Sequence, residues 1–460
     1  MTRLTLMLLP VFAMGAVAVA RGVAPPPNIV LILADDLGWA QSGFEDDSYY
    51  ETPRLHALRR EGLLFTSAYA AAPVCSPTRA ALLTGLSPAR LRLTDFLPPS
   101  APADRVLRPA PMVDSLALGS VTLAARLGAR GYRTALFGKW HLARGYFPPE
   151  SEHHPPSVFG FDDFLITHKP DDRTDPERDA HNTARITDRA LGFIDAHRAR
   201  PFFLKLAYNA PHTPLMERRE RIAYFRSKPG ADRPGNNPVL AAMIATLDEA
   251  IGRVFDRLAE HGLSGQTAVF FYSDNGGLRR VAAQSPLRGG KSQLYEGGIR
   301  VPLVVRWPGV VAPGGTTGAL VSAEDVSATI LDVAGVHAEE PLDGVAFTSV
   351  LRGEPLLPRG PLFWHYPHYH SEGGEPSSAV RRGDWKLIEF HEHTLTGRGP
   401  EPQLFQLADD PGETVSLASR QPAIAAELLA ELRAWRRRVD AAMPTVRLYP
   451  PPASAAPSAR

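Results

Sequence analysis

The sequence predicts an α/β fold, with a large mixed, mostly parallel sheet sandwiched by helices and a smaller C-terminal α+β domain. Four apolar runs of strand length each end in a polar cluster, and helix-like segments lie between them. Continuous apolar runs, rather than alternating ones, indicate strands that are buried on both faces by helices. With 460 residues, 44% hydrophobic and 22% charged, the chain is long enough for one large domain and a smaller one.

The large domain is expected to alternate strands and helices. The expected strands are Asn28–Ala34, Tyr132–Phe137, Phe202–Tyr208 and Thr267–Ser273. The expected helices are Pro53–Glu61, Arg79–Gly85, Val121–Gly131, Thr183–His197 and Leu240–His261. In such sheets ligands bind beyond the carboxyl ends of the strands, so we expect all four polar clusters at one edge.

The pattern changes beyond about residue 355, where short strand-like pieces precede a helix. These expected elements are Arg382–Phe390, Gln403–Leu407 and the helix near Ala423–Val439. The last residues show no periodicity and little to bury, which is typical of disorder. We therefore divide the chain into a leader (1–24), a large domain (25–355), a smaller α+β domain (356–445) and a disordered tail (446–460).

The leader has the layout of a secretory signal peptide. Arg3 precedes an apolar stretch, Leu4–Ala20, and small residues follow. This stretch is short for a membrane span of roughly 20 residues, which disfavours a membrane anchor. The chain has a single cysteine, Cys75, and so no internal disulfide, which favours a bacterial protein over a eukaryotic lumenal one. We expect a periplasmic or secreted protein with no membrane span after removal of the signal.

The overall charge is nearly balanced. The chain has 50 basic and 49 acidic residues, which gives a formal net charge of +1. No global field favours nucleic acid or an anionic membrane, so neither is an expected partner. Any specificity for an anion must therefore be local.

Carboxylates follow two of the expected strands. Asp35 and Asp36 end the first strand, and Asp274 and Asn275 end the fourth. An acidic pair alone is usually a solvated turn, but three carboxylates at one edge would repel each other without a cation. Ca²⁺ takes about six to eight such oxygen ligands, whereas Zn²⁺ prefers His and Cys. One Ca²⁺ is the first choice here, with Mg²⁺ or Mn²⁺ behind it.

Cys75 stands at the start of a helix-like run. Ser76 is placed to cap this helix, and Pro77 suits its first turn. The amide groups and the positive end of the helix dipole would favour an anion there, including a thiolate of Cys75. A buried structural cysteine is the alternative, but the whole segment Cys75–Arg79 weighs against it.

This segment resembles the Cys-x-Pro-x-Arg signature of the formylglycine-dependent type I sulfatases, a family of the alkaline phosphatase superfamily. The resemblance covers roughly residues 27–445, and Ala143, where Gly is frequent in the family, is a small departure. Further motifs follow in the family's order: Asp35-Asp36, Gly138-Lys139-Trp140-His141, Pro211-His212-Thr213-Pro214, Asp274-Asn275-Gly276 and Gly290-Lys291. The resemblance implies an alkaline phosphatase-like fold and the hydrolysis of sulfate esters.

The resemblance also implies the cofactors. A maturation enzyme would oxidise Cys75 to formylglycine, an aldehyde whose hydrate is a diol nucleophile. An oxygen of this modified residue would hold one Ca²⁺ together with Asp35, Asp36, Asp274 and Asn275. A diol, unlike a serine, allows sulfate to be expelled from the enzyme by elimination. We therefore expect Cys75→Ser to stall after one turnover.

The remaining motif residues would act on the diol and the substrate. By resemblance, Arg79 and Lys139 would orient the diol, and His141 would be its base. His212 and Lys291 would face the substrate sulfate and its leaving oxygen. Negative charge grows on this oxygen in the transition state, so fixed cations and a proton donor are chemically reasonable there.

Three histidines alternate with aromatic residues at the start of the smaller domain. His365, His368 and His370 have three possible roles: packing in a strand, binding a second metal, or contacting the substrate. The small domain of the family often leans over the site. We therefore expect His365 or His368 to touch the sugar or aryl group of the substrate.

These observations predict a sulfuric ester hydrolase that acts on a sulfated carbohydrate or an aryl sulfate. One alternative is a phosphonate monoester or phosphodiester hydrolase of the same superfamily. Another is a non-catalytic protein that binds sulfated glycans, but a binder needs no paired His141 and His212. Long loops at Leu97–Leu118, Arg144–Pro176 and His365–Pro376 are expected to select the natural substrate.

Overall fold

The structure is a computed structural model. It describes residues 26–44, 48–99, 104–145, 147–149, 152–171, 173–355 and 359–447. The predicted signal peptide and residues 448–460 of the predicted tail lie outside the described residues.

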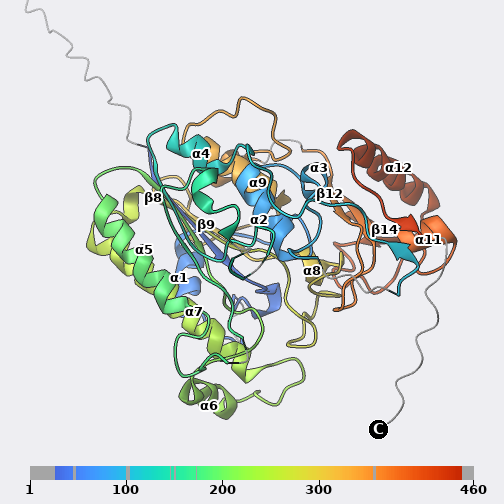
Figure 1. Cartoon of the computed structure of the whole chain (residues 1–460). Helices are drawn as coiled ribbons and strands as arrows, with labels where there is room; N and C mark the ends of the chain where they lie inside the picture. Colours follow the sequence, from blue (N-terminus) through green and yellow to red (C-terminus); the bar gives the residue numbers. More distant parts are fainter. Residues whose placement is uncertain are drawn as a thin grey trace, which may run out of the picture.

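An eight-stranded sheet forms the centre of the large domain (Figure 1). Its strands, in spatial order, are β10 (Gly315–Thr317), β2 (Leu63–Phe65), β9 (Leu303–Arg306), β8 (Thr267–Ser273), β1 (Asn28–Ala34), β7 (Phe202–Ala207), β5 (Arg133–Gly138) and β6 (Asp163–Ile166). Of these strands only β9 runs antiparallel to its neighbours, β2 and β8. The predicted mixed, mostly parallel sheet is therefore confirmed.

Helices cover both faces of this sheet. The first face carries α2 (Cys75–Thr84), α4 (Leu123–Gly128) and α9 (Ala323–Val333), and the second carries α1 (Pro53–Glu61), α5 (Thr183–His197) and α7 (Pro238–Glu260), with α6 (Arg219–Ser227) beside α7. Alternate residues of β1 serve the two faces: Ile29, Leu31 and Leu33 pack on the first, and Val30 and Ile32 on the second. This double burial explains the continuous apolar run in the sequence.

The smaller domain is a four-stranded antiparallel sheet with one long helix across it. Its elements are β12 (Leu362–Tyr366), β13 (Ser377–Arg382), β14 (Trp385–Phe390), β15 (Gln403–Gln406) and α12 (Pro422–Arg438). The predicted strand Arg382–Phe390 was wrong at its start. The chain turns at Gly383, whose φ of 59° suits glycine, so Arg382 ends one strand and Trp385 begins the next.

Several predicted boundaries shift because of capping. The helix predicted from Leu240 begins at Pro238, where the Asn237 side chain accepts hydrogen bonds from two backbone amides. The helix predicted over Val121–Gly131 begins later, at Leu123, because Thr122 caps it.

A short strand pair lies outside the predicted elements. Val446 pairs with Leu107, so the predicted tail begins too early. For the same reason, the predicted loop Leu97–Leu118 contains a strand.

The short elements complete the described chain. They are β3 (Ala68–Tyr69), α3 (Pro88–Leu91), β4 (Leu107–Arg108), α8 (Glu296–Ile299), β11 (Val321–Ser322), α10 (Thr348–Leu351), α11 (His391–Thr396) and β16 (Thr445–Val446). Within the described ranges, no helix combines the length and the apolar character that crossing a bilayer requires.

A buried ionic cluster joins the two domains close to Lys291 in the chain. Lys386 of β14 lies 2.9 Å from a carboxylate oxygen of Glu296 and 2.8 Å from one of Glu413, and all three side chains are fully buried. Glu296 begins α8 and follows shortly after Lys291. The small domain therefore anchors the segment that carries Lys291.

Candidate active site

The ends of β1 and β8 bring the predicted carboxylates together. Ala34 pairs with Ser273 in register, so Asp35 and Asp274 leave neighbouring strands at the same edge. The backbone amide of Asp36 donates to Oδ1 of Asp274 at 3.1 Å. This convergence is the arrangement that the strand pattern predicts.

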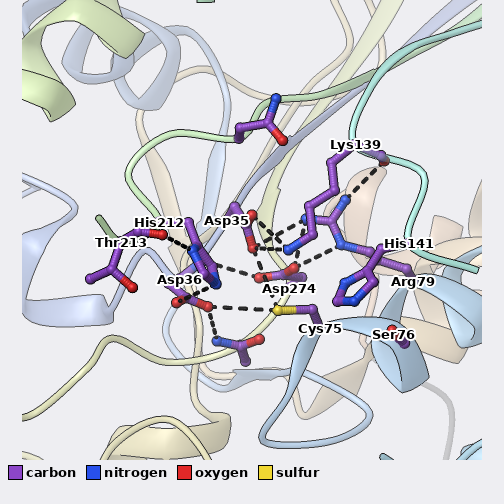
Figure 2. A network of polar contacts seen from close by, with 12 residues as sticks. Asp35, Asp36, Cys75, Ser76, Arg79, Lys139, His141, His212, Thr213 and Asp274 are labelled. Carbon is purple, nitrogen blue, oxygen red and sulfur yellow. Dashed lines mark hydrogen bonds and ion pairs between the residues drawn. The ribbon is translucent and has the colours of Figure 1, made fainter. Parts of the chain in front are cut away.

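Cys75 is the first residue of α2 and points at these carboxylates (Figure 2). Its Sγ lies 3.5 Å from Oδ1 of Asp35, 3.8 Å from Oδ1 of Asp36 and 3.5 Å from Nζ of Lys291. The side chain is buried, but among charged groups rather than apolar ones.

Two local expectations for Cys75 were wrong. Val74, not Ser76, is the N-cap residue of α2, and the Ser76 hydroxyl instead accepts a hydrogen bond from the amide of Leu97. The helix start also does not favour a thiolate: burial, followed by the charge of Asp274, raises the pKa of Cys75 to about 12. An unmodified Cys75 is therefore a protonated thiol at neutral pH.

Arg79 and Lys139 neutralise one side of the carboxylate cluster. Arg79 binds Asp274 through Nε at 2.9 Å and Nη2 at 2.7 Å, and its Nη2 lies 3.4 Å from Asp35. Nζ of Lys139 lies 2.9 and 2.7 Å from the two carboxylate oxygens of Asp35. Arg79 also donates to the backbone oxygen of Lys139 at 3.2 Å, so the two cations hold each other in place.

Lys291 and His212 lie on the other side. Nζ of Lys291 is 2.7 Å from Oδ2 of Asp36 and 3.1 Å from Nε2 of His212. An ammonium group can only donate, so Nε2 of His212 accepts, and its Nδ1 donates to the backbone oxygen of Thr213 at 2.5 Å. Burial, reinforced by Lys291, holds the pKa of His212 well below its ordinary value, so the ring is neutral.

His141 has a defined tautomer. Its Nε2 lies 2.6 Å from the carbonyl oxygen of Leu97, which can only accept, so the proton is on Nε2 and the lone pair is on Nδ1. Burial, followed by the charge of Lys139, holds the pKa of His141 well below its ordinary value. The ring is therefore a neutral base.

Two residues of this cluster have a left-handed backbone. Asp36 has a φ of 65° and His141 a φ of 55°, values that non-glycine residues rarely adopt. Such conformations cost about 1–3 kcal/mol and gather at functional sites. Asp36 lies shortly after the end of β1, and His141 lies shortly after the end of β5. The left-handed backbone at these positions directs both side chains toward the cluster.

The donor set fits a hard divalent cation. One ligand atom each from Asp35, Asp36, Cys75 and His212 lies within 4.8 Å of the others. Asn275, predicted as a ligand, donates through Nδ2 to Asp36 at 2.8 Å, and its buried Oδ1 has no hydrogen-bond partner among the described residues. An unsatisfied buried oxygen beside carboxylates is what an oxygen-liganded cation would satisfy.

His212 and Asp274 differ from the predicted ligand set. His212 lies in the compact group, but its Nε2 lone pair is used by Lys291. Asp274 lies outside that group, because its oxygens are used by Arg79 and by the amide of Asp36. Burial nevertheless raises the pKa of Asp274 above its ordinary value, as expected for a carboxylate that a cation would stabilise.

A cavity of about 410 Å³ opens above this cluster. Its floor contains Cys75, His141, His212 and Lys291, all of them predicted. Six further lining residues lie in the three loops that were expected to select the substrate, and Thr213 lies in one of the predicted motifs; the six are Leu97, Pro98, Phe147, Lys169, His370 and Glu372. Phe96, Leu278 and Arg280 were not predicted. The sequence could have drawn attention to Lys169, because it is one of only six lysines in the chain.

The structure places His365 and His368 away from the cavity, contrary to our expectation that one of them touches the substrate. His365 is buried between the Ser378 hydroxyl, at 2.7 Å, and the backbone oxygen of Ala442, at 2.8 Å. His368 is buried against the Thr94 hydroxyl at 2.8 Å. Neither lines the cavity, whereas His370 does. The geometry therefore favours packing for His365 and His368.

Two family models match the chain. The model described as Sulfatase matches residues 27–336. The model described as N-sulphoglucosamine sulphohydrolase, C-terminal, matches residues 290–438.

Curated relatives match most of the chain. Arylsulfatase A of Homo sapiens is 33% identical over 487 residues, which covers 93% of this chain and 91% of the relative. N-acetylgalactosamine-6-sulfatase of Mus musculus is 30% identical over 469 residues, which covers 90% of this chain and 85% of the relative.

Solved structures share the fold. The crystal structure of Ps i-CgsB in complex with k-i-k-neocarrahexaose is 28% identical, with a TM-score of 0.74 and coverage of 89% of this chain and 92% of that chain. The phosphonate monoester hydrolase of Agrobacterium radiobacter is 20% identical, with a TM-score of 0.69 and coverage of 92% and 100%, and shows the fold alone.

Proposed function

The chain belongs to the sulfatase family of the alkaline phosphatase superfamily and hydrolyses sulfate esters, and from this premise we propose a formylglycine at position 75, one Ca²⁺ and a sulfated carbohydrate as substrate. One observation carries the proposal. Sγ of Cys75 lies within 3.8 Å of Asp35, Asp36 and Lys291, at the floor of the cavity. A group at this position meets both the carboxylates that would hold a cation and a cation that would bind the sulfate.

The thiol itself is a poor nucleophile here, because its raised pKa keeps it protonated. When formed, the hydrated aldehyde of formylglycine supplies an oxygen nucleophile at the same position. His141 would take a proton from this residue, since its neutral ring presents the Nδ1 lone pair and lines the same cavity. Arg79 and Lys139 would fix the geometry through their ion pairs with Asp35 and Asp274.

Lys291 and His212 would act on the sulfate group. The Lys291 ammonium lies beside Cys75 and can neutralise the charge that develops on the leaving oxygen. The ammonium also has a proton to give, and the hydrogen bond to Nε2 of His212 directs it. Lys291, positioned by His212, would therefore stabilise and protonate the leaving oxygen, while the separate proton that His141 takes from residue 75 would pass to solvent.

We assign the cation to Asp35, Asp36, Asp274, Asn275 and the modified residue 75. All of their donors are oxygens after modification, and this set favours Ca²⁺ over Zn²⁺. When bound, Ca²⁺ supplies positive charge that polarises the nucleophile and offsets the repulsion between the carboxylates. His212 is not assigned as a ligand because Lys291 uses its Nε2 lone pair.

Carbohydrate is the proposed leaving group. One relative is an N-acetylgalactosamine-6-sulfatase, and the similar structure of Ps i-CgsB is a complex with k-i-k-neocarrahexaose. The cavity volume of about 410 Å³ falls within the range of about 300–1,000 Å³ for small-molecule sites. Its mouth combines aromatic side chains, Phe96 and Phe147, with polar ones, Arg280 and Glu372.

We also propose export through the signal peptide predicted over residues 1–24. The leader's early Arg3 and apolar stretch support this assignment. Expression of the full chain with and without residues 1–24 tests it. Activity in the periplasmic fraction is expected only for the full chain.

A substrate panel tests the function. The enzyme is produced together with a formylglycine-generating enzyme, and the alcohol or phenol released from each sulfate, phosphate or phosphonate ester is measured. We expect hydrolysis of 4-nitrophenyl sulfate and of sulfated monosaccharides, with little hydrolysis of phosphate diesters or phosphonate monoesters. Faster turnover of phosphonate monoesters would instead assign the site to that class. The Cys75→Ala variant, prepared in the same way, is the control for contaminating activity.

A further inference from the structure

The loop between β12 and β13 brings three polar groups of the cavity mouth together. His370 and Glu372 belong to this loop of the smaller domain, and Arg280 belongs to the large domain. All three line the cavity whose floor contains Cys75 and Lys291. We call His370, Glu372 and Arg280 the mouth cluster.

Backbone hydrogen bonds fix this loop. The His370 amide donates to the oxygen of Gly374, and the Gly373 amide donates to the oxygen of His370, both at 3.0 Å. Gly373 has a φ of 90°, which the turn requires and which suits glycine. The Gln293 side chain donates to the oxygen of Gly373 at 3.1 Å and so ties the turn to the segment that follows Lys291. The mouth cluster is therefore preorganised.

The proton of His370 is also fixed. The backbone amide of Glu372 donates to Nδ1 of His370 at 3.0 Å, so Nδ1 accepts and the proton of the neutral ring is on Nε2. Phe96 packs against the ring edge-to-face, with 5.3 Å between the centroids. Burial lowers the pKa of His370 to about 4, so the ring stays neutral at working pH. His370 thus presents one N–H donor.

Glu372 supplies the matching acceptor. Arg280 donates through Nε to Oε1 of Glu372 at 2.8 Å, which offsets the charge of both groups. The second oxygen, Oε2, can accept a hydrogen bond at the same mouth. One donor and one acceptor beside an aromatic wall suit the hydroxyl groups of a sugar, whereas an aryl group offers neither partner.

We infer that Nε2–H of His370 and the Glu372 carboxylate bind hydroxyl groups of the sugar that carries the sulfate ester, and so select a saccharide over an aryl sulfate. This inference rests on the proposed function, because it assumes that sulfate binds at the floor of the cavity. His370 is then a specificity residue for the leaving group and takes no part in proton transfer.

Two amide variants of His370 test its role as a hydrogen-bond donor separately from its role in the turn. In His370→Asn, the side-chain oxygen can still accept from the Glu372 amide, but the donor toward the cavity is lost. In His370→Gln, the longer side chain places an N–H near the original Nε2. His337→Asn, at an exposed histidine outside the cavity lining, is the matched control.

The readout compares two substrates for each enzyme. These are 4-nitrophenyl sulfate and whichever sulfated galactose, N-acetylgalactosamine or glucosamine the parent enzyme hydrolyses fastest. We expect His370→Asn to lower kcat/KM for the saccharide about tenfold, the effect of one hydrogen bond, mainly through KM. The aryl sulfate should change less than about twofold, and His370→Gln should recover most of the saccharide activity.

The outcomes separate this inference from the proposed function. A parent enzyme that hydrolyses neither substrate contradicts the proposed function. If it hydrolyses the aryl sulfate but no saccharide, the inference and the proposed carbohydrate substrate both fail, while sulfate ester hydrolysis stands. The inference also fails if His370→Asn matches the parent on the saccharide, or lowers both substrates equally. Melting temperatures of all variants are measured in parallel to identify a loss of folded protein.

Discussion

The floor and the mouth of the cavity are built in different ways. Most floor residues follow strand ends or lie in the first turns of α2, although Lys291 lies on the loop before α8, and Asp35, Arg79 and Lys139 form ion pairs that are almost fully buried. The mouth residues stand on loops, and the side chain of Arg280 is 59% exposed in its ion pair with Glu372. Regular structure therefore fixes most of the groups that do the chemistry, while loops present the groups that face the leaving group.

This contrast predicts two kinds of kinetic effect. Changes at the floor should lower kcat by orders of magnitude, because they remove groups that act in the transition state. Changes at the mouth should act mainly on KM, and only for substrates with a sugar.

Replacing Cys75 should have the largest effect. Cys75→Ala removes the nucleophile and should lower kcat by roughly 10⁴-fold or more. Cys75→Ser should give at most one turnover for each enzyme molecule, because a sulfated serine lacks the second hydroxyl group needed to expel sulfate. Stopped-flow release of 4-nitrophenol measures this burst. Steady multiple turnover by Cys75→Ser would overturn the elimination step.

Lys291→Ala should lower kcat for 4-nitrophenyl sulfate by about 10²–10³-fold, the usual effect of losing one charge-stabilising donor. Lys291 lies beside both Cys75 and His212, so its loss leaves the leaving oxygen without its cation. Lys228→Ala, at a lysine that pairs with Glu51 outside the cavity, is the matched control and should stay near the parent rate. Equal losses in the two variants would show a general effect on folding.

Bound Ca²⁺ should stabilise the fold through its ligands at the floor of the cavity, and residues at the mouth should not contribute to this effect. Ca²⁺ at about 100 times its dissociation constant should raise the free energy of unfolding by about 2.7 kcal/mol. Thermal unfolding in Ca²⁺ and in chelator measures this difference without an activity assay. Asn275→Ala should reduce it, because the buried Oδ1 is lost. Arg280→Ala should retain it, and a loss in both variants would contradict the assignment of the ligand.

Arg280→Ala should have the smallest effect. Arg280 holds Glu372 through one exposed ion pair, and such pairs contribute about 0–1 kcal/mol. We expect KM for a sulfated monosaccharide to rise about two- to fivefold. KM for 4-nitrophenyl sulfate should stay unchanged. A fall in kcat for both substrates would place Arg280 in the chemistry instead.

Strand patterning predicted that Asp35, Asp274, His141 and His212 would lie at one edge of the sheet, whereas Lys291 was named only from the resemblance to the sulfatases. Asp35 and Asp274 each follow a continuous apolar run, and parallel neighbours deliver such residues to one edge. Cys75 was correctly placed at a helix start, where Pro77 lies in the first turn, although Ser76 does not cap the helix. Its pKa could not be predicted, because it is raised first by burial and then by the charge of Asp274, both of which depend on the packing of distant parts of the chain.

The mouth was not predictable in the same way. His365, His368 and His370 look alike in the sequence, and only the turn closed by Gly373 and Gly374 directs His370 toward the cavity. The ion pair between Arg280 and Glu372 joins two loops that are 92 residues apart. No local periodicity in the sequence predicts such a contact, because it depends on how the two domains pack.

The most direct measurement is the mass of the peptide that contains position 75, from enzyme produced with a formylglycine-generating enzyme. We expect this peptide to have lost the sulfur and two hydrogens of Cys75 and gained one oxygen, together with aryl sulfate hydrolysis that rises with the modified fraction. Full activity from a preparation in which this peptide retains an intact thiol would contradict this expectation.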